Sequence, residues 1–418
     1  MRDGETPPIY ATSRRRWAVL LSVASIFVTQ GLVITAFAPV AIQVARAYGL
    51  SSTMTVNLCA MSFSLLSPPS DFLAVYLFSK YRTDNVLRVA SFISFIGAML
   101  RFASVSHQSF WPVVLGTFVM ASVASIFLNS QIIIANKWFS DSERAMAMAV
   151  LNVSTPIGQI ASFALTGLAF SGIDEDTMSP EEFNIKVKSA TETLITAQNL
   201  PYIVFFVIFQ IVIRDKPEVP PSAVAAVKPD DHSYCENFKL LWANKNFMIL
   251  AFSYAIVYGV YVSIGTAMSN LLNPFGFTPI DISIAGGTCL LAGVVAALII
   301  GCYLDCSAAY RKTHITLSVL TLASTATVVP ALAFGNGHLC YIMIPVVLLG
   351  ISSVSFFPTC LSYGAEQTFP LQPALVNAAM NFLGQISAFV MMAAATYITD
   401  VDATKHDEID SAGSIKER

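Results

Sequence analysis

The sequence predicts an all-α membrane protein built from two pseudo-symmetric helical bundles. Three observations predict this fold class: a low charge content, apolar runs of helix length, and landmarks that recur in both halves. Of the 418 residues, 55% are hydrophobic and only 12% are charged, whereas soluble domains carry about 25% charged residues. The mean hydropathy of +0.65 agrees with a chain that crosses a membrane many times.

Apolar runs define the expected spans, because a helix needs roughly 20 apolar residues to cross a bilayer. Helices are expected because they satisfy their own backbone hydrogen bonds in lipid. The short alternating segments of a transmembrane barrel are absent from the sequence. Eleven spans are predicted, at about 17–45, 53–78, 86–106, 110–136, 145–171, 198–213, 247–272, 282–304, 313–335, 338–362 and 374–398.

The distribution of Lys and Arg predicts the orientation. Sixteen of them fall in the N-terminal segment and the even-numbered loops, and four fall in the odd-numbered loops. Positive charge marks the cytoplasmic side, so the N-terminus is predicted to be cytoplasmic.

A long polar stretch at 214–246 reads as a cytoplasmic linker between two bundles, because it is rich in Pro and charge. The spacing of landmarks agrees: 64 residues separate Ser79 from Glu143, and 61 separate Asp305 from Glu366. A duplicated six-helix unit is typical of major facilitator transporters. The predicted division is an N-terminal tail at 1–16, a bundle at 17–213, the linker, a five-helix bundle at 247–398 and a polar tail at 399–418.

The second half is predicted to lack its last helix. The sixth span begins 55 residues after Glu143, and the same spacing from Glu366 passes Arg418. A truncated chain and a genuine eleven-span product are both compatible with this expectation.

Several segments carry a family resemblance. "RRRWAVLL", "QGLVITAFAP", "WFSDSERAMAMA", "GCYLDCSAAYRKT" and "EQTFPLQPALVNAAMNFLGQ" resemble the FLVCR-type transporters of solute carrier family 49, including the branch called disrupted in renal carcinoma protein 2. The resemblance covers most of residues 14–398. It implies the major facilitator fold and a uniporter or proton-coupled carrier of small organic solutes such as choline, ethanolamine, pyridoxine or haem.

The resemblance also implies where a solute would bind. A tryptophan of the first helix that faces the quaternary ammonium in the choline branch falls on Ile34, and Phe37 one turn later is its possible substitute. A fifth-helix glutamine of that branch falls on Pro156. An eleventh-helix glutamine falls on Asn381, which keeps an amide, and a seventh-helix tyrosine falls on Tyr254. The resemblance therefore implies a site that is only partly retained.

Polar residues inside apolar spans give further candidates, because buried polar groups in lipid need partners. Each is weighed against plain hydrogen bonding or packing between helices. Tyr254 and Tyr258 are spaced i, i+4 on one helix face, as are Asn377 and Asn381. The substrate-binding candidates are Gln30, Ile34, Phe37, Asn129, Tyr254, Tyr258, Asn377 and Asn381.

Charged residues have separate expectations. Asp71 lies about two turns inside its span, so it should line water, pair or be protonated, which would suit proton coupling. Arg101 is expected to snorkel to the headgroups at the far end of the third span. A gate is expected at the loops that carry the recurring landmarks, and it would be formed by Asp305, Arg311, Glu143 and Arg144.

Other classes of protein have little support in the sequence. No histidine lies at mid-depth in a span, and phosphate loops, nucleophile elbows and metal clusters are absent, so neither an enzyme nor a cofactor or metal site is expected. A non-transporting receptor or scaffold remains the alternative. The expected partners are a small organic solute and the lipid bilayer, without nucleic acid, for a monomer in the plasma membrane or a vacuolar or lysosomal membrane.

Overall fold

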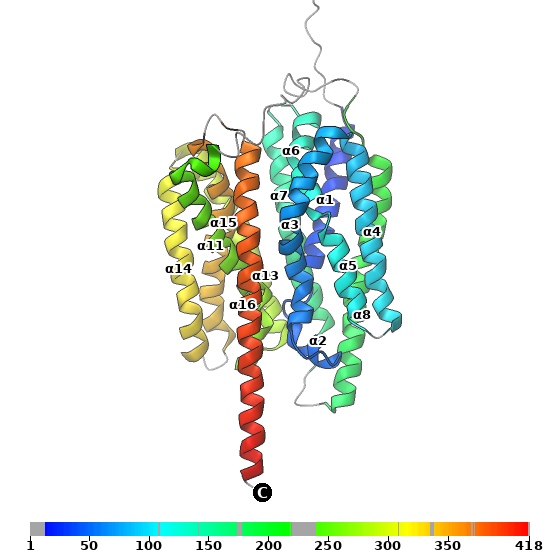
Figure 1. Cartoon of the computed structure of the whole chain (residues 1–418), viewed down its shortest axis with the longest axis vertical. Coiled ribbons are helices and arrows are strands. Elements are labelled where there is room, and N and C mark those ends of the chain that lie inside the picture. The colour runs from blue at the N-terminus through cyan, green and yellow to red at the C-terminus, as the bar shows by residue number, and fades with distance from the viewer. Residues whose placement is uncertain are drawn as a thin grey trace, which may run out of the picture.

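The computed structural model is a bundle of long helices that run roughly parallel to one another (Figure 1). It describes residues 13–416 except 108, 141, 174–177, 218, 220–239, 308, 335–337, 369–370 and 372. Eleven segments of this described chain have the length and apolar composition of a membrane span, which confirms the predicted number. Most of the predicted linker lies outside the described residues.

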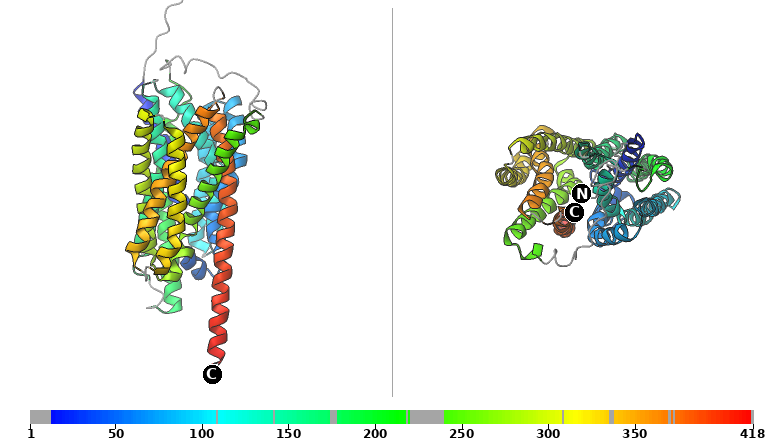
Figure 2. Two further views of the ribbon diagram at one scale, coloured as in Figure 1. Left: turned by 90° about the vertical axis from the view of Figure 1, so that its left-hand side faces the viewer. Right: turned by 90° about the horizontal axis from the view of Figure 1, so that it is seen from above.

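The helices fall into two groups, which Figure 2 shows side by side in the view along the helices. The first group contains α1 (Arg15–Ile34), α2 (Ala41–Ala47), α3 (Met54–Lys80), α4 (Thr83–His107), α5 (Trp111–Ala121), α6 (Ala124–Trp138), α7 (Arg144–Ala169) and α8 (Pro180–Val212). The second contains α11 (Lys245–Thr266), α12 (Met268–Leu272), the 3₁₀ turn η1 (Asn273–Phe275), α13 (Pro279–Ser307), α14 (Tyr310–Phe334), α15 (Leu339–Gln367) and α16 (Pro373–Lys416).

Three predicted spans are interrupted rather than continuous. The first ends at Ile34, and α2 begins only after Pro39, whose ring disfavours helical backbone in the residue before it. The seventh is also divided, into α11 and α12 at Ala267, although no proline lies at this break. The fourth breaks between α5 and α6, where the Ser122 hydroxyl bonds the carbonyl of Val119 at 2.7 Å. A hydropathy window does not detect such breaks, because the residues around them are apolar.

The sixth helix is longer than predicted. It begins at Pro180 instead of 198, with Ser179 accepting a hydrogen bond from the backbone N–H of Glu182. Its first turns carry too many charged residues for an apolar window, yet Phe183 and Val187 are buried. The last helix also passes the predicted end of its span, since α16 continues to Lys416 and leaves the bundle (Figure 1).

Glycines allow the closest helix contacts in both halves. A Cβ at Gly31 of α1 would collide with the backbone of α7 at Thr155, and a Cβ at Gly158 would collide with Val28. In the second half, a Cβ at Gly259 of α11 would lie 2.5 Å from the Ser387 hydroxyl of α16. The pairs α1–α7 and α11–α16 occupy equivalent positions in the two halves, so the pseudo-symmetry extends to these packing contacts.

Two helix pairs carry most of the contact between the halves. These are α7 with α13 and α3 with α16. Phe163 of α7 fills the space beside Gly286 of α13, and Phe72 of α3 meets Phe382 of α16 edge-on at 5.8 Å. The contact between the halves is therefore made mainly by α3, α7, α13 and α16.

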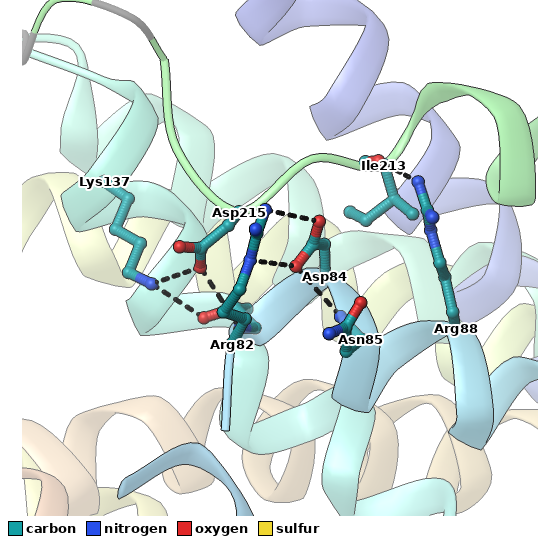
Figure 3. Close-up of polar contacts among 8 residues, drawn as sticks. Arg82, Asp84, Asn85, Arg88, Lys137, Ile213 and Asp215 are labelled. Atoms are coloured by element: carbon teal, nitrogen blue, oxygen red, sulfur yellow. Dashed lines mark hydrogen bonds and ion pairs between the residues drawn. The ribbon is translucent and has the colours of Figure 1, made fainter. Parts of the chain in front are cut away.

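A polar clamp ties three helices together at the face where α1 begins, here called the N-terminal face (Figure 3). Asp215 follows α8 and accepts hydrogen bonds from the Thr83 backbone N–H at 3.1 Å and from Lys137 Nζ at 2.7 Å. Lys137 Nζ also donates to Thr83 Oγ1 at 2.8 Å. Burial alone would raise the pKa of Asp215, but the hydrogen bond and charge of Lys137 outweigh burial and hold that pKa below its ordinary value.

The prediction for Arg101 is wrong. The side chain does not reach the headgroups, because it is 0% exposed and donates a 2.7 Å hydrogen bond from Nη2 to Gln198 Oε1 of α8. Gly116 of α5 lies directly against it. Sequence position places Arg101 near a helix end, but the early start of α8 covers that end with protein instead of lipid.

Candidate substrate site between the two halves

A stripe of tyrosines on α11 forms one wall of the candidate site. Tyr254 and Tyr258 stack with centroids 5.7 Å apart and planes 11° from parallel, as their i, i+4 spacing allows. Phe357 of α15 meets Tyr254, Tyr258 and Tyr261 edge-on, with centroid distances of 5.9, 5.1 and 5.5 Å. The rings are thus fixed in place by packing within the second half.

Two amides of α16 hold the tyrosine hydroxyls. The Tyr254 hydroxyl donates to Asn381 Oδ1 at 2.7 Å, and Gln385 Nε2 donates to the Tyr258 hydroxyl at 3.0 Å. Between these amides, a Cβ at Gly384 would lie 2.8 Å from Tyr254 Cε1, so the absence of a side chain lets the rings approach α16. The result is an aromatic and amide surface with two neutral hydrogen-bonded pairs.

A carboxylate and an amide of the first half form a second cluster. Asn129 Nδ2 of α6 donates to Asp71 Oδ1 of α3 at 2.8 Å and to the backbone oxygen of Ser125 at 2.9 Å. Ser67 and Ser125 join the same two helices through their hydroxyls at 2.8 Å. Phe72, the residue after Asp71, meets Phe382, the residue after Asn381, with ring centroids 5.8 Å apart. The two clusters therefore belong to one region between the halves.

The remaining substrate-binding candidates lie apart from the tyrosines. Phe37 packs edge-on against Phe110 at 5.2 Å, inside the first half. Ile34 and Phe37 line one small cavity that also contains Asn57 and Thr266. Gln30 of α1 is 4% exposed, and no hydrogen-bond partner is found for its Nε2. The described contacts do not bring these three residues to the tyrosine stripe.

Asn377 is a further candidate on α16. It lies one turn before Asn381 on α16, as the sequence spacing predicts. Its Oδ1 is buried and has no identified hydrogen-bond partner among the described residues. Asn377 therefore extends the row of amides toward the N-terminal face.

The predicted gate residues lie at the N-terminal face. Glu143 forms a 2.9 Å ion pair with Arg16, which also belongs to the first half. Arg144 starts α7, and Arg311 is exposed near the start of α14. The side chain of Asp305 lies outside the described residues. A latch between the halves made by these four residues stays a prediction.

At the opposite face, called the far face, hydrogen bonds join the two halves. The Ser269 N–H donates to the Ala38 carbonyl at 3.1 Å, and Gln43 Nε2 donates to Asn273 Oδ1 at 3.0 Å. These bonds connect the breaks α1–α2 and α11–α12, where the interrupted helices expose backbone groups. The short helices that sequence analysis missed thus build the contact at this face.

The same seal continues between α3 and α16. Asn270 Nδ2 donates to Thr53 Oγ1 at 2.7 Å, and Thr53 Oγ1 donates to Asp400 Oδ1 at 2.7 Å. Ser52 also bonds Asp400, and Asn57 Nδ2 donates to Thr396 Oγ1 at 3.0 Å. The far face is held closed by this network.

Sequence reasoning missed two members of the tyrosine site. Gln385 continues the i, i+4 series of Asn377 and Asn381, so that spacing could have identified it. Phe357 gives no signal of its own, because an aromatic residue in an apolar span is ordinary. Only the packing of α15 on α11 shows its role.

Comparison with known proteins places this architecture among transporters. The sequence profile of the Major Facilitator Superfamily matches residues 20–392. The Danio rerio choline/ethanolamine transporter flvcr2a is 24% identical over 380 residues, covering 89% of this chain and 78% of its own. The human choline/ethanolamine transporter FLVCR2 is 22% identical over 409 residues, covering 96% and 75%. Solute carrier family 49 member A3 of Xenopus tropicalis is 21% identical over 397 residues, covering 92% and 78%.

Solved structures share the fold at low sequence identity. A bacterial homologue of the human lysosomal transporter Spinster, in an inward-facing and unoccupied conformation, has a TM-score of 0.72 at 15% identity and covers 97% of this chain and 86% of its own. The Escherichia coli xylose transporter XylE has a TM-score of 0.65 at 9% identity and covers 94% and 98%.

Proposed function

This chain belongs to the Major Facilitator Superfamily, and we propose that it is an FLVCR-type member of solute carrier family 49 that moves a small organic solute by alternating access. The observation that carries the proposal is the cluster of Tyr254, Tyr258, Asn381 and Gln385 beside the space between the halves. Rings and amides on rigid helices offer a solute both π-faces and hydrogen bonds near mid-depth, where such carriers bind their substrates.

The proposed substrates are choline and ethanolamine first, with pyridoxine and haem as further candidates. Relatives named choline/ethanolamine transporters support this order. The tyrosine stripe supports it chemically, since a cation over an aromatic ring gains about 0.5–2 kcal/mol. Tyr254 and Tyr258 would then supply the aromatic face that Ile34 cannot.

The proposed cycle breaks and remakes the far-face seal. Bonds such as Asn270–Thr53 and Gln43–Asn273 hold this face closed, while rocking of the halves opens it and closes the N-terminal face. Glu143, Arg144, Asp305 and Arg311 are proposed to latch the N-terminal face in that second state. We propose that the N-terminus is cytoplasmic and that the carrier lies in the plasma membrane or a vacuolar or lysosomal membrane, so that the far face, which these bonds join, is the one turned away from the cytoplasm.

The test is uptake by the purified chain in lipid vesicles. Radiolabelled choline, ethanolamine, pyridoxine and haem are each supplied outside, and empty vesicles give the background. We expect saturable uptake of at least one solute and its loss in Tyr258→Ala. The matched control is Tyr341→Ala, because Tyr341 is 58% exposed and lies at the start of α15, far along the helix from Phe357. Folded protein that takes up none of the four would favour the receptor or scaffold alternative.

A further inference from the structure

Asp71 is a carboxylate within the apolar length of α3, and the described residues provide no basic side chain that pairs with it. Ion pairs among the described residues include Arg16–Glu143, Arg82–Asp84, Lys137–Asp215 and Lys186–Glu182, and Asp71 belongs to none of these four. A charged side chain in a membrane span is costly unless it meets water or a partner, so such residues mark functional sites by default.

The surroundings of Asp71 hold the carboxylate in one orientation. Asn129 donates to Oδ1, and Asn129 is itself fixed by the Ser125 carbonyl. The Ser67–Ser125 contact then ties α3 to α6 one turn away. These partners are neutral, so they position the negative charge without neutralising it.

Opposite this carboxylate stands the tyrosine stripe of the other half. Phe72, the residue after Asp71, meets Phe382 of α16 at 5.8 Å. Phe382 follows Asn381, which accepts the hydrogen bond of Tyr254, and Tyr258 stacks on Tyr254. The aromatic rings and the carboxylate both attract a positive charge, the rings through their negative faces. Neither half provides both elements, so the combined site exists only where the halves meet.

We infer that Asp71 is the counter-ion for the cationic group of the transported solute, which binds between this carboxylate and the ring of Tyr258, the more exposed of the two stacked tyrosines. The inference rests on the proposed function and narrows its substrate class to small ammonium compounds. The amides of Asn381 and Gln385 then face the neutral, hydrogen-bonding part of the solute. Uncharged solutes of the same shape are rejected, because they leave the carboxylate without a partner.

The test compares choline with its uncharged carbon isostere, dimethylbutanol. Binding of each to the purified full chain in detergent is measured by calorimetry, and ethanolamine is added as a second cation. We expect the wild-type chain to bind the cations and not the isostere. Asp71→Asn should weaken cation binding by about 30-fold, the ratio that corresponds to about 2 kcal/mol for a truncated buried charge pair, while Asp71→Glu retains part of the affinity. Asp281→Asn is the matched control, since Asp281 bonds only Thr278 at the start of α13.

The outcomes separate this inference from the proposed function. Equal cation affinity in Asp71→Asn and wild type would overturn the inference about Asp71 and would not contradict the proposed transport function. Wild-type protein that binds neither cation would overturn it as well. Asp71-dependent cation binding without uptake in vesicles would support the inference and contradict the transport function. If Asp71→Asn changed only the pH dependence of uptake and kept the selectivity for charge, Asp71 would be a proton carrier and not a counter-ion.

Discussion

The Tyr254 hydroxyl donates a 2.7 Å hydrogen bond to Asn381 Oδ1, which joins α11 to α16 beside the space between the halves. Hydrogen bonds between membrane helices are worth about 0.6 kcal/mol on average, so the pair is a small part of the stability of the fold. Under the proposed function, its role is to orient the Asn381 amide beside the solute.

Asn381→Ala should therefore weaken solute binding more than it weakens the protein. We expect affinity for the transported solute to fall by up to about tenfold, about 1.4 kcal/mol, with normal expression and a nearly unchanged melting temperature. Calorimetry and thermal unfolding of the purified variant measure the two effects. Asn246→Ala is the control, because Asn246 is exposed at the start of α11. Unchanged affinity in Asn381→Ala would remove this residue from the site.

Gly384→Ala should disturb the same site by steric means. The added Cβ would lie 2.8 Å from Tyr254 Cε1 and 3.3 Å from Tyr258 Cδ1, closer than such atoms pack. Overpacking of this kind costs about 1–3 kcal/mol, and we expect displaced tyrosine rings and a several-fold loss of uptake. Gly301→Ala serves as the control, since no atom lies within 4 Å of its added Cβ. Equal uptake by both variants would show that the ring positions do not matter.

The sequence predicts the number and the order of the spans, because apolar length alone decides what crosses a bilayer. It does not predict the breaks after Ile34 and Thr266, since a hydropathy average is the same for a straight and a broken apolar helix. These breaks matter, because they supply the backbone and side-chain groups of the far-face seal.

The candidate site is predicted only where spacing within one helix carries the signal. Two pairs of candidate residues are in contact: Tyr254 with Tyr258, and Asn129 with Asp71. Only the first pair has a helical spacing in the sequence, because Asp71 and Asn129 lie on different helices. Phe37 packs against Phe110, the residue before α5, and its predicted role in binding a solute stays a prediction. Contacts between helices far apart in sequence depend on how the helices pack, and this packing cannot be predicted from the residue spacing of a single sequence.

Asn270→Ala should shift the conformational equilibrium toward an open far face. Asn270 Nδ2 donates to Thr53 Oγ1 and Thr399 Oγ1, and Thr53 lies on the opposite half. Only the bond to Thr53 crosses between the halves, and losing one bond of about 0.6 kcal/mol should change the ratio of open to closed molecules by about threefold. Cross-linking of cysteines at positions 54 and 397, which line one cavity at this face, measures the closed state.

The cross-linking experiment has its own control and contrary result. Both measurements use a chain whose native cysteines are replaced, and Thr327→Ala is the control because its hydroxyl bonds only its own helix. We expect lower cross-linking yield in Asn270→Ala and no change in the control. A yield equal to that of the parent would mean that this bond does not hold the far face closed.

Asp215→Asn should destabilise the clamp at the N-terminal face in a pH-dependent way. The folded-state pKa of Asp215 is lowered from 3.8, because the effects of Lys137 and the Thr83 N–H exceed that of burial. A lowered pKa means that the carboxylate stabilises the folded chain fully above about pH 3.8 and loses this contribution only as the pH falls through the lowered value. Thermal unfolding of wild type and Asp215→Asn should therefore differ by a constant amount between about pH 8 and pH 5 and converge only below about pH 4. Asp84→Asn is the control, because it removes the neighbouring ion pair with Arg82. Its loss of melting temperature measures the effect of removing a carboxylate at this face that does not contact Lys137. Convergence of the wild-type and Asp215→Asn curves near pH 6 would contradict the direction of the shift and with it the clamp's dependence on Lys137.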